Sequence, residues 1–193
     1  AVLGGRRSVA AVSTLVVPAM LGVYLAASAA VILGNLAQLP ESLGLILRCA
    51  FSPRAAAGGA AGCAVTALDA LRYGVSRGVF SNEAGLGSAG ICAASAASDS
   101  PVRQAYIGMT GVFFDTTVVC TATALAICCS GVLGQADGAA LTILAFQTVL
   151  GPLGGALVAF SVLLFAFSSI LGWAYQGEQA FAYLTGGRFI PPY

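Results

Sequence analysis

The chain has 193 residues, of which 59% are hydrophobic and only 8% are charged, and its mean hydropathy is +0.94. Soluble domains carry about 25% charged residues, so this composition indicates an integral membrane protein. The net charge of +1, with neither lysine nor histidine, excludes a basic nucleic-acid interface and any histidine-based metal or acid–base site.

The first predicted element is a membrane-spanning helix over residues 8–38. No charged residue occurs between Arg7 and Glu41, a run longer than the ~20 residues that cross a bilayer. Pro18 lies inside this run and is expected to kink the helix, because proline removes a backbone donor. Residues 41–50 show apolar side chains at helical spacing but are too few to span, which predicts an interfacial helix.

Residues 63–97 are too long for one straight span and carry four charged residues. They predict a partly interfacial helix followed by a membrane helix that is broken near residues 82–87. A second half-helix of small residues is expected over 88–97. The break is expected where polar residues and glycines interrupt sequence of membrane type, because unwound backbone at membrane depth occurs in transporters.

Two further spans are predicted in the second half of the chain, over residues 102–131 and 153–185. Between them we expect a loop at 134–138 and a short surface helix up to Leu150, which Gly151-Pro152 ends. With the first span and the broken helix, this makes about four crossings. The sequence therefore predicts an all-α integral membrane protein, and the whole chain is expected to form a single membrane domain.

The broken helix is the first candidate for a ligand site. A break leaves free carbonyls at the end of one half-helix and free N–H groups at the start of the next. The carbonyls suit an ammonium group or a cation and the N–H groups suit a carboxylate, so a zwitterionic amino acid matches both ends. Asn82 and Glu83 favour this interpretation over helix packing through small residues, since polar groups at membrane depth are costly. The role of Glu83 stays open, and the GxGxxG match at residues 85–90 lacks the strand that a dinucleotide site requires.

One face of the last predicted span combines hydroxyl groups with an aromatic ring. Its members, at the i, i+3, i+4, i+7, i+8 spacing of one helical face, are Phe165, Ser168, Ser169, Gly172 and Trp173. Two hydroxyls and a backbone carbonyl offer the oxygen ligands that a hard cation such as sodium prefers. Trp173 would form a wall of a small pocket. The alternatives are serines that bond back to their own helix and a tryptophan that anchors the helix at the membrane interface.

Asp115 is an acidic residue among apolar neighbours, which marks either a functional site or a polar strut. We favour the structural role, because several hydroxyls that could hydrogen-bond its carboxylate lie close by in the sequence, on Thr116, Thr117, Thr121 and Thr123. The six cysteines show no CxxC spacing, and we expect them to pack as small apolar residues.

Three motifs, in order along the chain, resemble the sodium:alanine (alanine or glycine:cation) symporter family. They lie at residues 77–89, at 111–116 together with 120–124, and at 165–173. The resemblance extends over nearly the whole chain. It implies the C-terminal-half fragment of a carrier with a LeuT-like fold of the APC superfamily, an inverted repeat of two five-helix units.

By that resemblance the chain contains core helices five to eight, and the remaining transporter helices are absent from it. Half of a sodium site would consist of the Phe165 carbonyl with the hydroxyls of Ser168 and Ser169. The amino acid would lie against the break, beside Phe80, Asn82, Gly85, Gly87, Ser169 and Trp173. Ala174 and Gln176 stand where the family leads us to expect serine and tyrosine, which bears on substrate preference.

The function expected from these features is sodium-coupled symport of a small neutral amino acid, alanine or glycine, by alternating access. The protein would be a multi-pass protein of the plasma membrane. It would not be an enzyme, since the sequence lacks histidine and any nucleophile–base pair. Sodium would be co-transported, and no organic cofactor is expected. Two alternatives stay open, a proton-coupled or exchange carrier and a non-transporting pore or structural membrane subunit.

Overall fold

The computed structural model describes residues 5–50, 72, 75, 76, 78–83 and 85–187, and of residues 5–10, 49 and 50 the backbone alone. Every regular element among them is helical, as the composition predicts. The elements are α1 (Gly5–Gly34), the 3-10 turn η2 (Leu36–Gln38), α2 (Leu39–Ala50), α5 (Ser88–Ser95), α6 (Pro101–Val112), the π-helix η3 (Phe113–Val119), α7 (Cys120–Cys129) and α8 (Gly138–Thr185).

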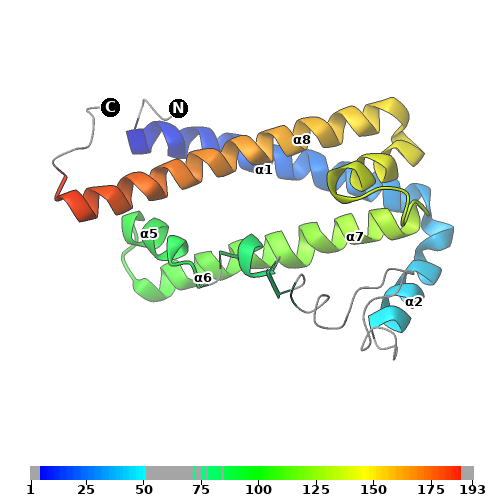
Figure 1. The fold of residues 1–193 in the computed structure, drawn as a ribbon, viewed down its shortest axis with the longest axis horizontal. Helices are drawn as coiled ribbons and strands as arrows, with labels where there is room; N and C mark the ends of the chain where they lie inside the picture. Colours follow the sequence, from blue (N-terminus) through cyan, green and yellow to red (C-terminus); the bar gives the residue numbers. More distant parts are fainter. Residues whose placement is uncertain (1–4, 51–71, 73–74, 77, 84, 188–193) are drawn as a thin grey trace.

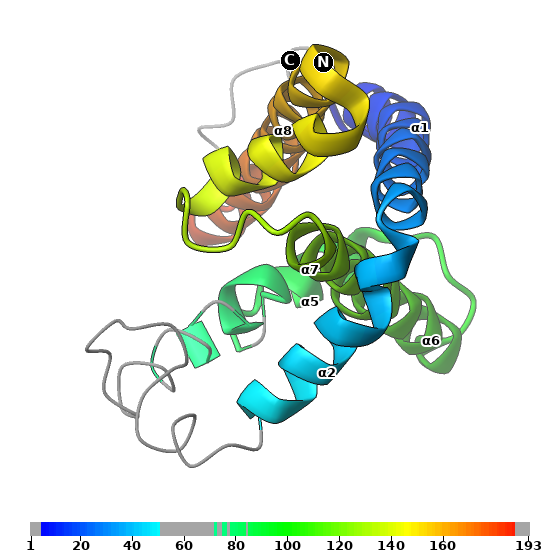
Figure 2. The ribbon, with the colours of Figure 1, turned by 90° about the vertical axis from the view of Figure 1, so that its right-hand side faces the viewer.

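The long helices form one bundle. Figure 1 shows α1 and the long part of α8 lying side by side, with the continuous helix of α6, η3 and α7 below them. Seen from the end in Figure 2, α1, α7 and α8 surround a shared interior, and α2 points away from it. The short helix α5 lies against α8, so the segment after the predicted break is held by the last span.

Three of the described helices are long and apolar enough to cross a membrane, over Ala11–Gly34, Pro101–Cys129 and Gly138–Thr185. They match three of the four predicted spans. The first helix continues through Pro18 and ends at Gly34, before the predicted limit, because the chain tightens into the 3-10 turn that follows. The fourth predicted crossing and the interfacial helix before it fall in 63–97, where much of the chain lies outside the described residues.

The interior is formed where the three long helices meet. Its buried side chains are Tyr24, Ala27, Val31, Ala126, Val132, Ala145, Phe146 and Val158. Tyr24 of α1 joins the other helices directly. Its hydroxyl lies 2.7 Å from Oγ1 of Thr123 in α7, and its ring stacks on that of Phe146 in α8, with 5.5 Å between ring centroids. The hydrogen bond and the ring contact of Tyr24 therefore fix α1 against both α7 and α8.

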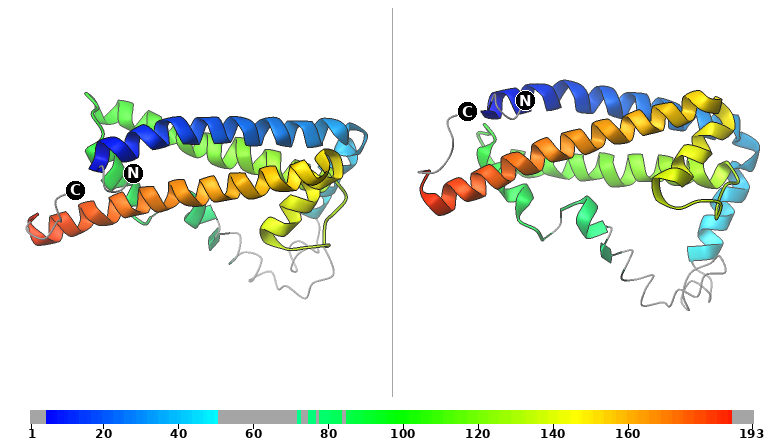
Figure 3. Two further views of the ribbon diagram at one scale, coloured as in Figure 1. Left: turned by 90° about the horizontal axis from the view of Figure 1, so that it is seen from above. Right: turned by 45° about the horizontal axis from the view of Figure 1, so that its top comes forward.

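The break at Gly151 is present, and the helix before it exposes one face, as predicted, while its other face is buried. Gly151 adopts φ 58° and ψ −147°, and Pro152 follows, so the two pieces of α8 meet at a sharp angle that Figure 3 shows. The first piece folds back on the bundle and buries Phe146 completely. Gly154 permits this close approach, since a Cβ there would lie 2.5 Å from the Phe146 carbonyl oxygen.

Candidate functional site

The break predicted in the third segment is present. Residues 78–81 are helical, the described residues from 82 to 87 lie in turns and a bend, and α5 begins at Ser88. Three residues in the turn have left-handed backbone, Glu83 (φ 51°), Gly85 (φ 80°) and Gly87 (φ 81°). The glycines enter this region without a Cβ penalty, whereas Glu83 does so at a cost. The break is therefore built into the sequence by two glycines, and one acidic residue is held in an unfavourable conformation beside them.

The first half of the broken helix is fixed to the π-helix η3 by two hydrogen bonds. The Ser81 hydroxyl donates to Oδ2 of Asp115 over 2.8 Å, and the Thr116 hydroxyl donates to Oδ1 of Asn82 over 2.8 Å. The Asn82 amide also donates to the Gly78 carbonyl over 3.1 Å. Both the oxygen and the nitrogen of the Asn82 side-chain amide are thus hydrogen-bonded within the protein. The partner of Asp115 is Ser81, so the suggestion of a threonine partner was wrong.

The π-helical geometry explains how two consecutive residues reach the same segment. A π-helix has more residues per turn than an α-helix, so Asp115 and Thr116 are separated by a smaller rotation about the axis. Both side chains can then face residues 81 and 82. Single π-helical turns inside longer helices occur frequently at functional sites. We call these two bonds the η3 clamp.

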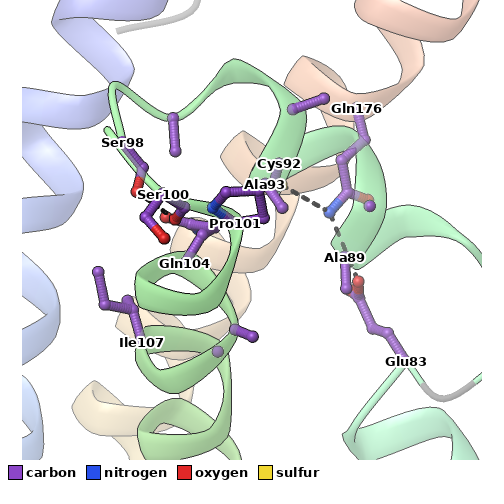
Figure 4. A pocket seen from close by; sticks show the side chains of 15 residues that line it. Glu83, Ala89, Cys92, Ala93, Ser98, Ser100, Pro101, Gln104, Ile107 and Gln176 are labelled. Carbon is purple, nitrogen blue, oxygen red and sulfur yellow. Dashed lines mark hydrogen bonds between the residues drawn. The ribbon is translucent and has the colours of Figure 1, made fainter.

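The second half of the broken helix is fixed through Glu83. Its carboxylate accepts a hydrogen bond from the Ser88 hydroxyl at the start of α5. It also receives the side-chain amide of Gln176 in α8, with Nε2 3.5 Å from Oε2 of Glu83. The same amide nitrogen lies 3.4 Å from Sγ of Cys92 in α5. Figure 4 shows Gln176 pointing from α8 toward both side chains, at the edge of an open groove of about 900 Å³.

The predicted hydroxyl-bearing face of α8 is partly accessible. The Ser168 hydroxyl donates to the Phe165 carbonyl oxygen over 2.9 Å, so two of the three proposed sodium ligands already lie side by side. This contact is also the intrahelical bond that the alternative interpretation requires. Ser169 is exposed, and 49% of Trp173 is exposed. The ring of Phe165 packs edge-on against Tyr24, with 6.1 Å between centroids, which anchors this turn to α1.

Helical spacing connects this face to the break. Ser169, Trp173 and Gln176 are separated by four and three residues, so they lie on one side of α8. Gln176 contacts Glu83 from that side, which places the break next to the serine- and tryptophan-bearing surface. Among the described residues the rings of Phe80 and Trp173 do not touch. Phe80 is 68% exposed, so the two aromatic walls face open space.

The hydroxyl-bearing face of α8 offers carbonyl and hydroxyl oxygens as possible cation ligands. Within the described ranges no three or more histidine, cysteine, aspartate or glutamate side chains gather as a metal site would require. Cys92, Cys120 and Cys129 are free thiols. Cys49 and Cys63 lie where no side chain is described.

Comparison with known protein families matches residues 1–191 to the sodium:alanine symporter family. This chain belongs to the sodium:alanine symporter family. It is 44% identical over its whole length to an uncharacterised transporter of Haemophilus influenzae and 41% identical to the sodium/alanine symporter AgcS of Methanococcus maripaludis. It is 38% identical, over 97% of its length, to the probable sodium/glutamine symporter GlnT of Bacillus subtilis.

Membership of the sodium:alanine symporter family confirms the resemblance carried by the three motifs. Three of the chain's described helices are long and apolar enough to cross a membrane, as expected for a multi-pass integral membrane protein of this family. The chain corresponds to a fragment of its relatives, since it spans 42% of the length of the Haemophilus and Methanococcus proteins and 38% of the Bacillus protein.

Proposed function

We propose that this chain is part of a sodium-coupled symporter for a small neutral amino acid, alanine or glycine, working by alternating access. The observation that carries the proposal is the broken helix lying against the hydroxyl-bearing side of α8, joined to it through Gln176 and Glu83. In this proposal the chain supplies core helices five to eight of a LeuT-like transporter. Helices outside the chain complete the binding sites.

Sodium would bind to the Phe165 carbonyl and to the hydroxyls of Ser168 and Ser169. The first two oxygens are 2.9 Å apart, close enough to ligate one cation together, and the Ser169 side chain is exposed. When a cation binds, the Phe165 carbonyl oxygen would coordinate the cation and would no longer accept the hydrogen bond from the Ser168 hydroxyl. The contact between Phe165 and Tyr24 supports this geometry, because it holds the carbonyl-bearing turn against α1. Sodium is then cargo that also orders the last span.

The amino acid would lie at the break. The backbone around Gly85 and Gly87 has no side chain to block approach, and the exposed rings of Phe80 and Trp173 would form apolar walls. Ser169 would stand between the amino acid and the cation. Asn82 would shape the pocket rather than bind the amino acid directly, since its side-chain amide is hydrogen-bonded to Thr116 and Gly78.

The test is amino-acid uptake by the full-length protein in proteoliposomes, with and without an inward sodium gradient. We expect saturable alanine accumulation that requires the gradient, because sodium would favour the state in which α8 and the break form the amino-acid site. Glycine should compete well and leucine poorly, because we expect Phe80 and Trp173 to close around a small side chain in the complete transporter. Accumulation that a proton gradient drives equally well would contradict sodium coupling. Passive, non-saturating flux would contradict symport altogether.

A further inference from the structure

The break joins two parts of the bundle that are held differently. Residues 81 and 82 are held by the η3 clamp, through two hydrogen bonds of 2.8 Å. Glu83, the next residue, instead bonds to Ser88 of α5. The left-handed backbone of Glu83, Gly85 and Gly87 separates the two halves. A shift of α5 relative to η3 would therefore be absorbed in this turn, where the backbone leaves helical geometry and Leu86 N–H donates to the Glu83 carbonyl oxygen over 3.2 Å.

Gln176 is the side chain of α8 that bonds to the second half of the break. Its single amide group lies between the Glu83 carboxylate at 3.5 Å and the Cys92 thiol at 3.4 Å. An N–H···O hydrogen bond is usually 2.7–3.2 Å long, so the contact with Glu83 is at its outer limit. A displacement of α8 by a few tenths of an ångström would make this bond short or break it. The contact is thus sensitive to the position of α8.

The position of Gln176 relates this contact to the proposed sodium ligands. It lies seven residues after Ser169, two helical turns along the same side of α8. A change at Ser168 and Ser169 that moves or stiffens this helix is carried to Gln176 by the helix itself. The ligand pair and the contact with Glu83 are then two ends of one rigid element.

We propose that Gln176 is a positioning residue that couples cation binding on α8 to the conformation of the broken helix, through its amide contacts with Glu83 and Cys92. This inference rests on the proposed function for the cation and the amino acid. In the sodium-bound state the amide bonds firmly to the Glu83 carboxylate and holds α5 against α8. Without sodium the contact loosens and α5 moves with the break.

Cys92 provides a readout that does not depend on transport. Its thiol is exposed in the groove and lies against the Gln176 amide. We expect sodium to slow alkylation of Cys92 in the full-length protein by a small maleimide, measured by mass spectrometry of the peptide that contains it. Gln176→Leu should remove this sodium response and raise the half-maximal sodium concentration for alanine uptake at least about fivefold, the lower range of allosteric coupling.

The matched control is Gln179→Leu, the same substitution one turn further along α8. Gln179 lines a different groove, with Ile91 and Tyr183, and its replacement should leave both readouts within twofold of the parent protein. Cys92 alkylation that ignores sodium in the parent protein would overturn the proposal. An unchanged sodium response in Gln176→Leu would also overturn it.

A charge exchange separates coupling from a merely structural role. Gln176→Glu places a second carboxylate beside Glu83 and should impair sodium-dependent uptake. Combining it with Glu83→Gln restores one amide and one carboxylate, so uptake should recover toward the parent level. A double variant no better than Gln176→Glu would contradict the pairing. In a further outcome, the parent protein shows no sodium-dependent uptake while Gln176→Leu still removes a sodium effect on Cys92 alkylation. That result would contradict the proposed symport and would support the proposed role of Gln176.

Discussion

Replacing both Ser168 and Ser169 by alanine is expected to abolish the sodium dependence of amino-acid uptake. The structure places the Ser168 hydroxyl beside the Phe165 carbonyl and leaves Ser169 exposed, so the double variant removes two of three proposed ligands. If each hydroxyl contributes to a bound cation as much as a hydrogen bond to a charged group, the loss is about 1.5–3 kcal/mol each. The half-maximal sodium concentration should therefore rise more than about a hundredfold.

The control for this variant is Thr185→Ala, which also removes a hydroxyl from α8. The Thr185 hydroxyl donates to the Phe181 carbonyl over 2.8 Å, within the helix and beyond the proposed site. Its loss should leave the sodium response unchanged. If the double serine variant takes up alanine with the sodium response of the parent protein, the serines only bond to their own helix and sodium binds elsewhere.

Asp115→Ala is expected to reduce alanine uptake about tenfold without preventing membrane insertion. It removes the acceptor of the Ser81 hydroxyl and opens half of the η3 clamp on the broken helix. The bond lies in an exposed part of the structure, and losing a hydrogen bond to a carboxylate costs about 1.5–3 kcal/mol, enough for a change of this size. Asp115→Asn keeps an acceptor oxygen for Ser81 and should retain most of the uptake. The comparison is made on protein amounts matched by quantification of the membrane fraction.

The other half of the clamp offers a second comparison. Thr116→Val removes the donor to Asn82, whereas Thr110→Val removes a hydroxyl that bonds within the same continuous helix, to the Ile107 carbonyl. Uptake should fall in the first variant and not in the second. Equal uptake by all of these variants and the parent protein would show that the clamp does not position the break.

The break could be predicted from the sequence because its cause is local. Asn82 and Glu83 beside Gly85 and Gly87 cannot continue a membrane helix cheaply, and the backbone leaves helical geometry at these glycines. The break at Gly151 has the same kind of cause, a glycine followed by a proline. Such residues act through their own backbone, so no knowledge of neighbouring helices was needed.

The contacts that hold the break could not be predicted, because they are made over long distances in the sequence. Ser81 and Asp115 are 34 residues apart, as are Asn82 and Thr116. The π-helix that brings Asp115 and Thr116 together contains only phenylalanine, aspartate, threonine and valine. It has no glycine or proline from which a departure from α-helical geometry could be predicted. The sequence therefore indicated that Asp115 needed a partner, and the partner became known only with the fold.

Two further features depend on packing between helices. The helix before Gly151 was predicted at the surface, and the burial of Phe146 on its inner face is explained by the close approach that Gly154 allows. Gln176 stood out in the sequence only as a departure from the residue expected in the family. Its contact with Glu83, 93 residues away, gives it a structural partner. A polar residue at an unusual position in an apolar helix was the signal for the Gln176 contact.

The measurement that tests the central claim most directly is equilibrium binding of alanine to the purified full-length protein over a series of sodium concentrations. Coupling between the α8 oxygens and the break predicts that sodium lowers the Kd for alanine at least about fivefold, and that alanine raises the affinity for sodium by the same factor. Potassium at equal ionic strength should not replace sodium. An alanine Kd that is the same in sodium and in potassium would contradict the account.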